Sequence, residues 1–340
     1  MLSTIASQIE RSKMIRFLSY CTHSIERASL IFKIMKTKLI FVLLFLFICG
    51  CSKEIVRRKQ PVMGTFVEIK VITTDVPHAE KSIEKVFFEI DRIENIFSDY
   101  KNESLVGKLN HNKEIITDNT EFIELLNRSI YFSEITDGLF DITVKPLMLL
   151  WNFKENKKPP DKEKIKKILK SVGYKNIIIK NYNNKTKKII LENSAMLDFG
   201  GIAKGYAVDK AIEILYKENI TTALVNIGGN IRTIGKRKWK IGIRNPDNGN
   251  NIIKILSLKN QSVSTSGNYE QYFIYKGKRY THILNPKNGY PVDTDYKSVT
   301  IVSDNATDSD ALSTIVFLLG QKKGYEFLKK YFPKAELLIF

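Results

Sequence analysis

The residues best suited to chemistry lie in the C-terminal half of this sequence, starting with the run 308–314, Asp-Ser-Asp-Ala-Leu-Ser-Thr. On a helix, Asp310 and Thr314 are four residues apart and share one face. A carboxylate and a hydroxyl placed this way could hold Mg²⁺, which takes few protein ligands and completes its shell with water or phosphate oxygens. Helix capping by Asp308 or Ser309 explains the same residues equally well.

A second candidate is the glycine-rich run 198–209, Asp-Phe-Gly-Gly-Ile-Ala-Lys-Gly-Tyr-Ala-Val-Asp. Its paired glycines would let the backbone approach a ligand closely, and the free N–H groups of a following helix suit phosphate oxygens. Lys204 would add a positive charge there. The spacing excludes both the P-loop and the Gly-x-Gly-x-x-Gly fingerprint. An ordinary strand–turn–helix stays open as an alternative.

His282 is the candidate base, within Tyr-Thr-His-Ile-Leu-Asn-Pro. A histidine has an unperturbed pKa near neutrality and can accept a proton from a hydroxyl. A lone histidine is nevertheless more often structural than catalytic. The segment 225–230 contains a Gly-Gly pair after an apolar strand and predicts a tight turn or a close approach of the backbone to a ligand, with a purely structural turn as the alternative. The segment 264–269, Ser-Thr-Ser-Gly-Asn-Tyr, precedes the His282 motif, in which the flanking hydroxyls and Asn285 would suit a base or phosphate contact.

One more segment, 138–143, reads Gly-Leu-Phe-Asp-Ile-Thr and mixes apolar side chains with a carboxylate at a turn. These residues could line a pocket. A buried phenylalanine followed by a capping Asp141 accounts for the same pattern.

The elements that must position these residues follow from hydrophobic periodicity and from turn residues. Helices and strands are mixed without strict βαβ alternation, which predicts an α+β fold in one functional unit. Helices are predicted over 79–97, 120–136, 162–172, 204–217 and 310–319, and strands over 67–72, 177–180 and 188–191, with further short strands between 222 and 303.

The N-terminal region has the pattern of a bacterial lipoprotein signal. Basic residues precede an apolar run over 39–48, and Ile-Cys-Gly-Cys ends at Cys51. About 20 apolar residues are needed to span a bilayer as a helix, so this run is too short. We expect a signal over 35–50, a lipid on Cys51 and a tether over 51–57. An ordinary signal peptide or a short buried helix is the alternative.

Residues 1–34 precede a complete signal, so we expect translation to start at Met35 and the segment to be spurious. A mitochondrial transit peptide is the rival interpretation, which Glu10 and Glu26 weaken because such peptides contain few acidic residues. The remaining domain is predicted over 58–340. Removal of 1–50 also removes Cys21 and Cys49, which leaves Cys51 as the one cysteine and excludes cysteine catalysis.

The charge balance is strongly basic, with 54 Lys and Arg against 36 Asp and Glu, a net charge of +18. Removal of residues 1–50 lowers this to +13, because they carry seven basic and two acidic residues. The lysines lie in polar runs without interleaved aromatic residues, so solvated faces are expected and nucleic-acid binding is not. The charge could attract an anionic substrate or a membrane surface.

The order of these motifs along the chain resembles the ApbE family, the bacterial FAD:protein FMN transferases, over residues 58–340. The resemblance implies a single mixed domain similar to the T-fold, mostly antiparallel strands with flanking helices. It also implies a periplasmic lipoprotein. The motifs that carry it lie at 61–65, 97–110, 138–143, 198–209, 225–230, 264–269, 282–291 and 310–314.

The resemblance further implies a reaction in which FAD is cleaved with Mg²⁺, AMP is released and FMN is esterified to a threonine of an acceptor protein. His282 matches the base that deprotonates the threonine, while the Gly201 carbonyl, Asp310 and Thr314 match the metal ligands. The positions matching FAD contacts are Met63, Tyr100, Leu139, Phe140, Asp141, Asp198, Lys204 and Leu284.

Two positions depart from the family pattern. Some members carry Asp where this chain has Ser313, and the family often has Asp at Asn285. The ligand role of the first position and any carboxylate role at the second are therefore open. The same site would also suit a Mg²⁺-dependent FAD pyrophosphatase with water as acceptor, and a flavin-binding lipoprotein without activity is the alternative from another class.

Overall fold

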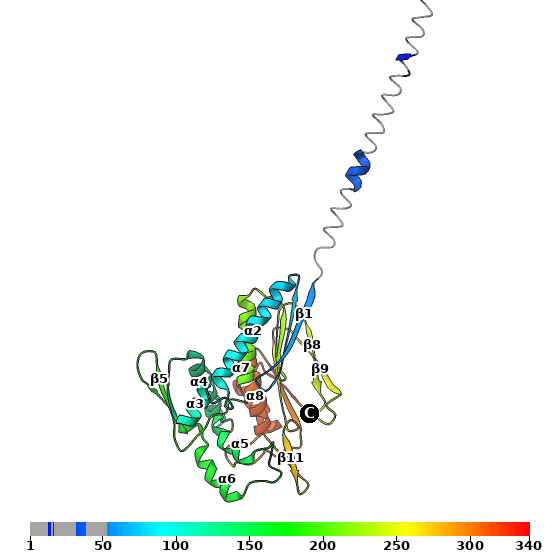
Figure 1. Cartoon of the computed structure of the whole chain (residues 1–340). Coiled ribbons are helices and arrows are strands. Elements are labelled where there is room, and N and C mark those ends of the chain that lie inside the picture. The colour runs from blue at the N-terminus through cyan, green and yellow to red at the C-terminus, as the bar shows by residue number, and fades with distance from the viewer. Residues whose placement is uncertain (1–12, 15, 17–31, 39–52) are drawn as a thin grey trace, which may run out of the picture. The chain divides into compact units, whose positions relative to one another are not determined.

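The structure is a computed structural model that describes residues 13, 14, 16, 32–38 and 53–340 (Figure 1). The chain divides into two compact units, Met1–Lys53 and Glu54–Phe340, and the second contains every element discussed below. The apolar run 39–48 and Cys51, on which the lipoprotein prediction rests, lie outside the described residues. Within the described part, no helix is long and apolar enough to cross a membrane.

The centre of the second unit is a seven-stranded sheet in which every strand pairs antiparallel with its neighbours. In its second strand Val67, Ile69 and Val71 are fully buried, so alternate side chains enter the core. In spatial order the strands are β1 (Glu54–Val62), β2 (Thr65–Thr73), β6 (Ala223–Ile227), β7 (Asn230–Ile234), β10 (Ser262–Gly267), β13 (Ser298–Ser303) and β14 (Glu336–Ile339).

Three helices cover one face of this sheet (Figure 1): α2 (Val76–Phe97), α7 (Ala203–Lys217) and α8 (Ala306–Leu319). α2 packs on α7, and α7 packs on α8. Gly205 lies at the α7–α8 crossing, where a Cβ atom would come within 2.1 Å of the Ala306 carbonyl oxygen. Only glycine permits this close approach, which fixes the spacing of the two helices.

The other face of the sheet is covered by a hairpin of β8 (Trp239–Arg244) and β9 (Ile252–Leu258). Trp239, Ile241 and Ile243 alternate with exposed residues along β8. They form a second apolar cluster with sheet side chains that include Leu224 and Val263. The sheet is therefore covered by helices on one face and by this hairpin on part of the other.

Smaller elements complete the unit. A three-stranded sheet has the order β3 (Glu114–Thr117), β5 (Lys187–Leu191), β4 (Ile177–Asn181), and the hairpin of β11 (Tyr272–Tyr275) and β12 (Lys278–Thr281) packs on Trp151. The remaining helices are α3 (Leu105–Asn112), α4 (Thr120–Ile135), α5 (Lys145–Trp151), α6 (Lys162–Ile168) and α9 (Gln321–Tyr331), with single 3-10 turns at Ile142–Val144, Leu169–Ser171 and Tyr174–Asn176.

The α+β prediction is confirmed, but several boundaries differ. The tether predicted over 51–57 is wrong for residues 54–57, because they pair with β2 as part of β1. Most side chains of β1 are exposed, so the backbone ladder, and not an apolar pattern, makes it a strand. The helix predicted at 310–319 starts four residues earlier, capped by the Asn305 side chain, which accepts the Asp308 N–H.

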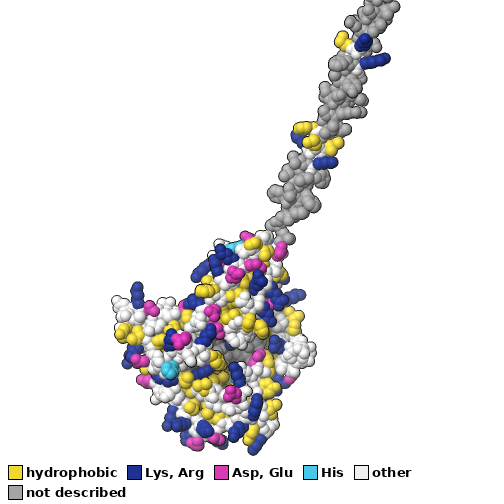
Figure 2. All heavy atoms as spheres, viewed as in Figure 1, with side chains coloured by type: hydrophobic (Ala, Val, Ile, Leu, Met, Phe, Trp, Pro, Cys, Tyr) yellow, Lys and Arg dark blue, Asp and Glu magenta, His cyan; other side chains and the backbone are white. Residues whose placement is uncertain are grey.

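Basic side chains do not gather in one patch on the face that Figure 2 draws. Lys and Arg are spread over this face with Asp and Glu among them. Many oppositely charged side chains of the described residues form salt bridges at the surface, such as Lys85–Glu218 at 2.7 Å and Lys278–Asp293 at 2.8 Å. Such exposed pairs contribute little to stability, commonly about 0–1 kcal/mol each.

Candidate functional site

Two tight turns lie side by side at one end of the large sheet. Met63 and Gly64 join β1 to β2, and Gly228 and Gly229 join β6 to β7, all four with positive φ. The Gly228 N–H donates to the Phe66 carbonyl at 3.1 Å, which ties the turns together. Met63 has φ +54°, a conformation that costs energy for a residue with a Cβ and that is enriched at functional sites.

Hydroxyl groups join β10 to α8 near the same end. Ser264 and Ser309 share a hydrogen bond of 2.8 Å, and the Ser266 hydroxyl lies 2.8 Å from that of Ser313 and 3.1 Å from that of Thr314. Ser313 also donates to the Asp310 carbonyl. These bonds fix the face of α8 that carries the predicted metal ligands.

The three predicted metal ligands converge at the start of α7 and on α8. Asp310 is buried, and its Oδ2 accepts the Gly205 N–H at 2.8 Å. Gly201 lies against Thr314, since a Cβ on this glycine would be 3.7 Å from the Thr314 Oγ1. The sequence separates these residues by about a hundred positions, and the α7–α8 crossing brings them together.

The donor set fits a hard divalent cation. The Gly205 N–H, which would close a helical turn on the Gly201 carbonyl, bonds to Asp310 instead. In the described residues that carbonyl accepts no hydrogen bond, and Asp310 has no cation within ion-pair distance. No cluster of three His, Cys, Asp or Glu side chains occurs in the described part of the chain. A carboxylate, a hydroxyl and a carbonyl are the oxygen ligands Mg²⁺ prefers, with the remaining positions left to phosphate or water.

Lys204 acts electrostatically on several of the predicted site residues. Burial raises the pKa of the Asp198 and Asp310 carboxyls, and the Lys204 ammonium acts in the opposite direction on both. The same ammonium also lowers the pKa of His282. Lys204 itself donates to the Gly200 carbonyl at 2.7 Å. One positive charge therefore lies within electrostatic range of the candidate metal ligand, the candidate base and a candidate FAD contact.

His282 is oriented by the backbone of Gln271. The backbone N–H of His282 donates to the Gln271 carbonyl at 3.1 Å, and the ring Nδ1 lies 3.3 Å from the same oxygen. A proton on Nδ1 satisfies this contact and leaves Nε2 as the basic nitrogen. Burial lowers the pKa of the imidazole below its usual 6.5, so the ring is neutral at neutral pH and can accept a proton.

A known protein family matches most of this chain. The model of the ApbE family matches residues 63–339. The chain belongs to the ApbE family. A FAD:protein FMN transferase of Klebsiella pneumoniae is 33% identical over 274 residues, which cover 79% of this chain and 84% of that protein. A second, of Haemophilus influenzae, is 30% identical over 86% of this chain and 89% of its own length.

Solved ApbE structures share the fold of this ApbE-family chain. The ApbE protein of Thermotoga maritima superposes with a TM-score of 0.76 at 36% identity, covering 84% of this chain and 94% of that one. The flavinyl transferase ApbE of Pseudomonas stutzeri gives a TM-score of 0.72 at 28% identity, covering 82% and 89%.

Among the positions expected to contact FAD in this ApbE-family chain, Asp198 and Tyr100 have side chains that are suited to contact its rings. Asp198 lies on the loop before α7 and accepts only the Gly200 N–H at 2.7 Å among the described residues. Tyr100, after α2, exposes 76% of its surface. A carboxylate can accept a hydrogen bond from a flavin or adenine N–H, and an exposed ring can stack on either.

Other predicted FAD contacts have side chains engaged within the ApbE-family fold. Asp141 accepts the Thr143 N–H and hydroxyl and the Tyr174 N–H, so the capping alternative describes its carboxylate. Phe140 lies against Gly201 and packs on Phe132. Leu284 is buried in the cluster around Trp151, and Leu139 is half-buried. Any contact of Asp141 or Leu284 with FAD would involve the backbone.

The two departures from the family pattern both have structural partners. Ser313 is buried and bonded to Ser266, as described above, so its hydroxyl faces β10. The Asn285 side-chain oxygen accepts the Lys287 N–H at 2.9 Å and shapes the turn that follows. Ser266 lies in the segment 264–269 that the sequence singled out, but no role was predicted for it individually; a hydroxyl at every second position of 262–266 is the signal that could have indicated one.

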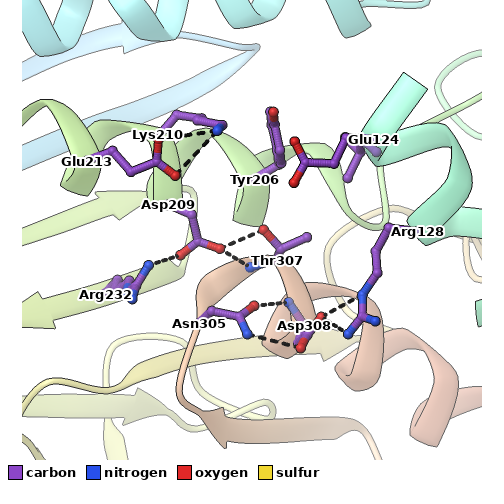
Figure 3. Close-up of a pocket in the computed structure, with 11 residues that line it drawn as sticks. Glu124, Arg128, Tyr206, Asp209, Lys210, Glu213, Arg232, Asn305, Thr307 and Asp308 are labelled. Carbon is purple, nitrogen blue, oxygen red and sulfur yellow. Dashed lines mark hydrogen bonds and ion pairs between the residues drawn. The ribbon is translucent and has the colours of Figure 1, made fainter. Parts of the chain in front are cut away.

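A separate cavity of about 460 Å³ lies beside the middle of α7, between α4 and the start of α8 (Figure 3). Its walls are charged but paired. Asp209 accepts from the Arg232 guanidinium at 2.6 Å and from the N–H groups of Ala306 and Thr307 at 2.8 Å each. Asp308 pairs with Arg128 at 2.6 Å. The hydrogen bonds of Asp209 therefore tie α7 to the start of α8.

Proposed function

We propose that this chain is a Mg²⁺-dependent FAD:protein FMN transferase that attaches FMN through a phosphoester bond to a threonine of an acceptor protein. The observation that supports the proposal is the meeting of Gly201 with Thr314, and of Asp310 with the start of α7, at the α7–α8 crossing. The Lys204 ammonium acts electrostatically on both Asp310 and His282. The activity named for its curated relatives supports the same reaction.

The residues of the chain divide the work. Gly201, Asp310 and Thr314 would hold Mg²⁺, which when bound polarises the pyrophosphate oxygens of FAD and neutralises their charge. Asp198 and Tyr100 would bind and orient the FAD rings. Positioning of this kind supplies most of the catalysis in phosphoryl transfer, because little covalent chemistry is required of the protein.

His282 would move the proton. Its neutral Nε2 would accept the proton of the threonine hydroxyl as that oxygen attacks the FMN phosphorus. The bond between this phosphorus and the bridging oxygen breaks, and AMP leaves with the bridging oxygen. Lys204 would help to offset the negative charge that develops on the phosphoryl oxygens.

The test is incubation of the purified protein with FAD, Mg²⁺ and a threonine-bearing acceptor peptide, followed by mass spectrometry. A peptide adduct of FMN together with free AMP is the expected result. Free FMN and AMP without an adduct would favour the pyrophosphatase, with water as acceptor. Release of neither product, with FAD still bound, would overturn catalysis in favour of flavin binding alone. Asp310→Ala serves as the matched control for metal-dependent cleavage.

We also propose that the chain is a lipoprotein anchored through Cys51, with its catalytic unit on the periplasmic side of a bacterial membrane. The basic residues before 39–48, the short apolar run and the Gly-Cys pair support this. Metabolic labelling with a tagged fatty acid tests it. Labelled wild type and unlabelled Cys51→Ser are expected, and equal labelling of both would contradict the proposal.

A further inference from the structure

A buried ion pair lies beside the candidate FAD residues and has no part in the function proposed above. The Lys145 ammonium donates to the Asp99 carboxylate, and the two side chains are only 8% and 9% exposed. Removing two charges from water is costly, so a buried pair of this kind needs a reason beyond surface solubility. Asp99 lies within a motif that carries the family resemblance, but the sequence predicted no role for it or for Lys145.

The pair joins two segments that carry FAD candidates. Asp99 precedes Tyr100 at the end of α2, and Lys145 opens α5 directly after the turn that follows Phe140. Asp198 lies within electrostatic range of both charges. Burial is the main cause that raises the pKa of its carboxyl, Asp99 raises this pKa further, and Lys145 lowers it. Three parts of the candidate FAD site therefore meet at this pair.

Tyr100 has few other contacts that could fix its ring. It is largely exposed, and its backbone N–H is held only by the Ser98 hydroxyl at 3.3 Å. The Lys145 ammonium lies 4.4 Å from the ring centroid, close enough for a cation–π interaction. Lys154 lies farther away, at 5.5 Å, on an exposed side chain. The buried lysine is thus the better-fixed of the two cations on this ring.

We propose that Lys145, fixed by Asp99, is a positioning residue that holds the Tyr100 ring ready to stack on a planar ring of FAD. The inference rests on the proposed function, since it requires that FAD binds here. A ring already held in its bound orientation loses less freedom on binding, and the affinity rises accordingly. Lys145 would act through Tyr100 and would not contact the phosphates of FAD.

FAD affinity is the direct test, measured by flavin fluorescence in EDTA and again with Mg²⁺. Lys145→Met is expected to raise the Kd for FAD about tenfold, an effect of the size that ordering one side chain can have. In a Tyr100→Leu background the same change should have no further effect, because its target is absent. Lys154→Met is the matched control, with a Kd within about twofold of wild type. Additive effects of the first two changes would overturn the inference.

A second pair of variants separates positioning from stability. Lys145→Met leaves the Asp99 carboxylate buried without a partner and is expected to lower the thermal midpoint. Asp99→Asn combined with Lys145→Met removes that charge and is expected to recover stability while FAD affinity stays weak. Recovery of both would show that the pair is only structural. The kcat at saturating FAD is expected to stay within about threefold of wild type.

The two proposals fail differently. A wild-type chain that binds no FAD under either condition overturns the proposed function and this inference together. A wild-type chain that binds FAD with the same Kd as Lys145→Met overturns only the role of the ion pair.

Discussion

Two carboxylates, Asp209 and Asp310, lie on opposite sides of the α7–α8 crossing, and their surroundings differ. Asp209, on α7, accepts from Arg232, from two N–H groups at the start of α8 and from the Thr307 hydroxyl at 2.6 Å. Asp310, on α8, accepts from Gly205 on α7 and has no cation at ion-pair distance in the described part of the chain.

This difference distinguishes a carboxylate that stabilises the fold from one that is suited to bind a ligand. The oxygens of Asp209 are occupied by donors of the fold, so this carboxylate stabilises the crossing. The Asp310 carboxylate is buried without an ion-pair partner among the described residues, and burial raises its pKa, although Lys204, the Gly205 N–H and the Asn230 side chain act in the opposite direction. A buried carboxylate left this way is suited to a cation from outside the chain. Changes at Asp209 should therefore affect stability first, and changes at Asp310 activity first.

The largest expected effect comes from Asp310→Ala. Without the carboxylate the cation loses its one charged protein ligand, and turnover is expected to fall by about a thousandfold or more, or roughly 4 kcal/mol in transition-state stabilisation. AMP release from FAD measures this, and circular dichroism checks that the variant is folded. Unchanged activity with full metal dependence would show that Asp310 is not a ligand.

Asp209→Ala should lower stability first, in contrast to Asp310→Ala. It removes the partner of a half-buried arginine and a cap of α8, so we expect the free energy of unfolding to fall by about 3 kcal/mol. Urea unfolding measures it. Asp209→Ala with Arg232→Met should recover part of the loss, since no unpaired guanidinium remains. A stable Asp209→Ala with lost turnover would reverse the assigned roles of the two carboxylates.

His282→Ala should impair transfer more than binding. Loss of a general base typically costs about 100-fold or more in rate, and the Kd for FAD should stay within about twofold. Flavinylation of the acceptor peptide and flavin fluorescence measure the two. An equal loss of FAD affinity would indicate a binding role.

The pH dependence of transfer sharpens this prediction. In the proposed reaction the neutral imidazole of His282 would be the active form, and the pKa of this ring is lowered from 6.5. The transfer rate should therefore be flat near pH 7 and fall as the pH drops through a value below 6.5. The decrease should be absent in the residual activity of His282→Ala. A decrease centred well above 6.5 would contradict the assignment.

The smallest effect is expected at the edge of the cavity, where Lys210 is half-buried and Glu213 is exposed. Lys210 pairs with Glu213 at 3.2 Å, one turn apart on α7. Lys210→Ala should change the free energy of unfolding by only about 0.5 kcal/mol, as is usual for such pairs, and leave turnover unchanged. Thermal unfolding together with AMP release tests both. A large loss of turnover would mean that the cavity contributes to the site directly.

The sequence by itself determined the elements with a strong apolar period. The helix predicted over 79–97 is α2, and that predicted over 204–217 is α7, because their buried stripes repeat at helical spacing. It also contained the site motifs, since turns that need glycine and a helix face that carries Asp310 and Thr314 leave a local signal. The order of these motifs was enough to indicate the family.

The tertiary structure alone decided what the sequence could not show. β1 was missed because its partner is β2 and its exposed charged residues carry no period. The sequence could not separate a capping carboxylate from a ligating one, since Asp141, Asp209 and Asp310 all lie near helix starts or crossings. Only packing determines which donors reach each oxygen. The Asp99–Lys145 pair, 46 residues apart, likewise exists only once α2 and α5 are brought together.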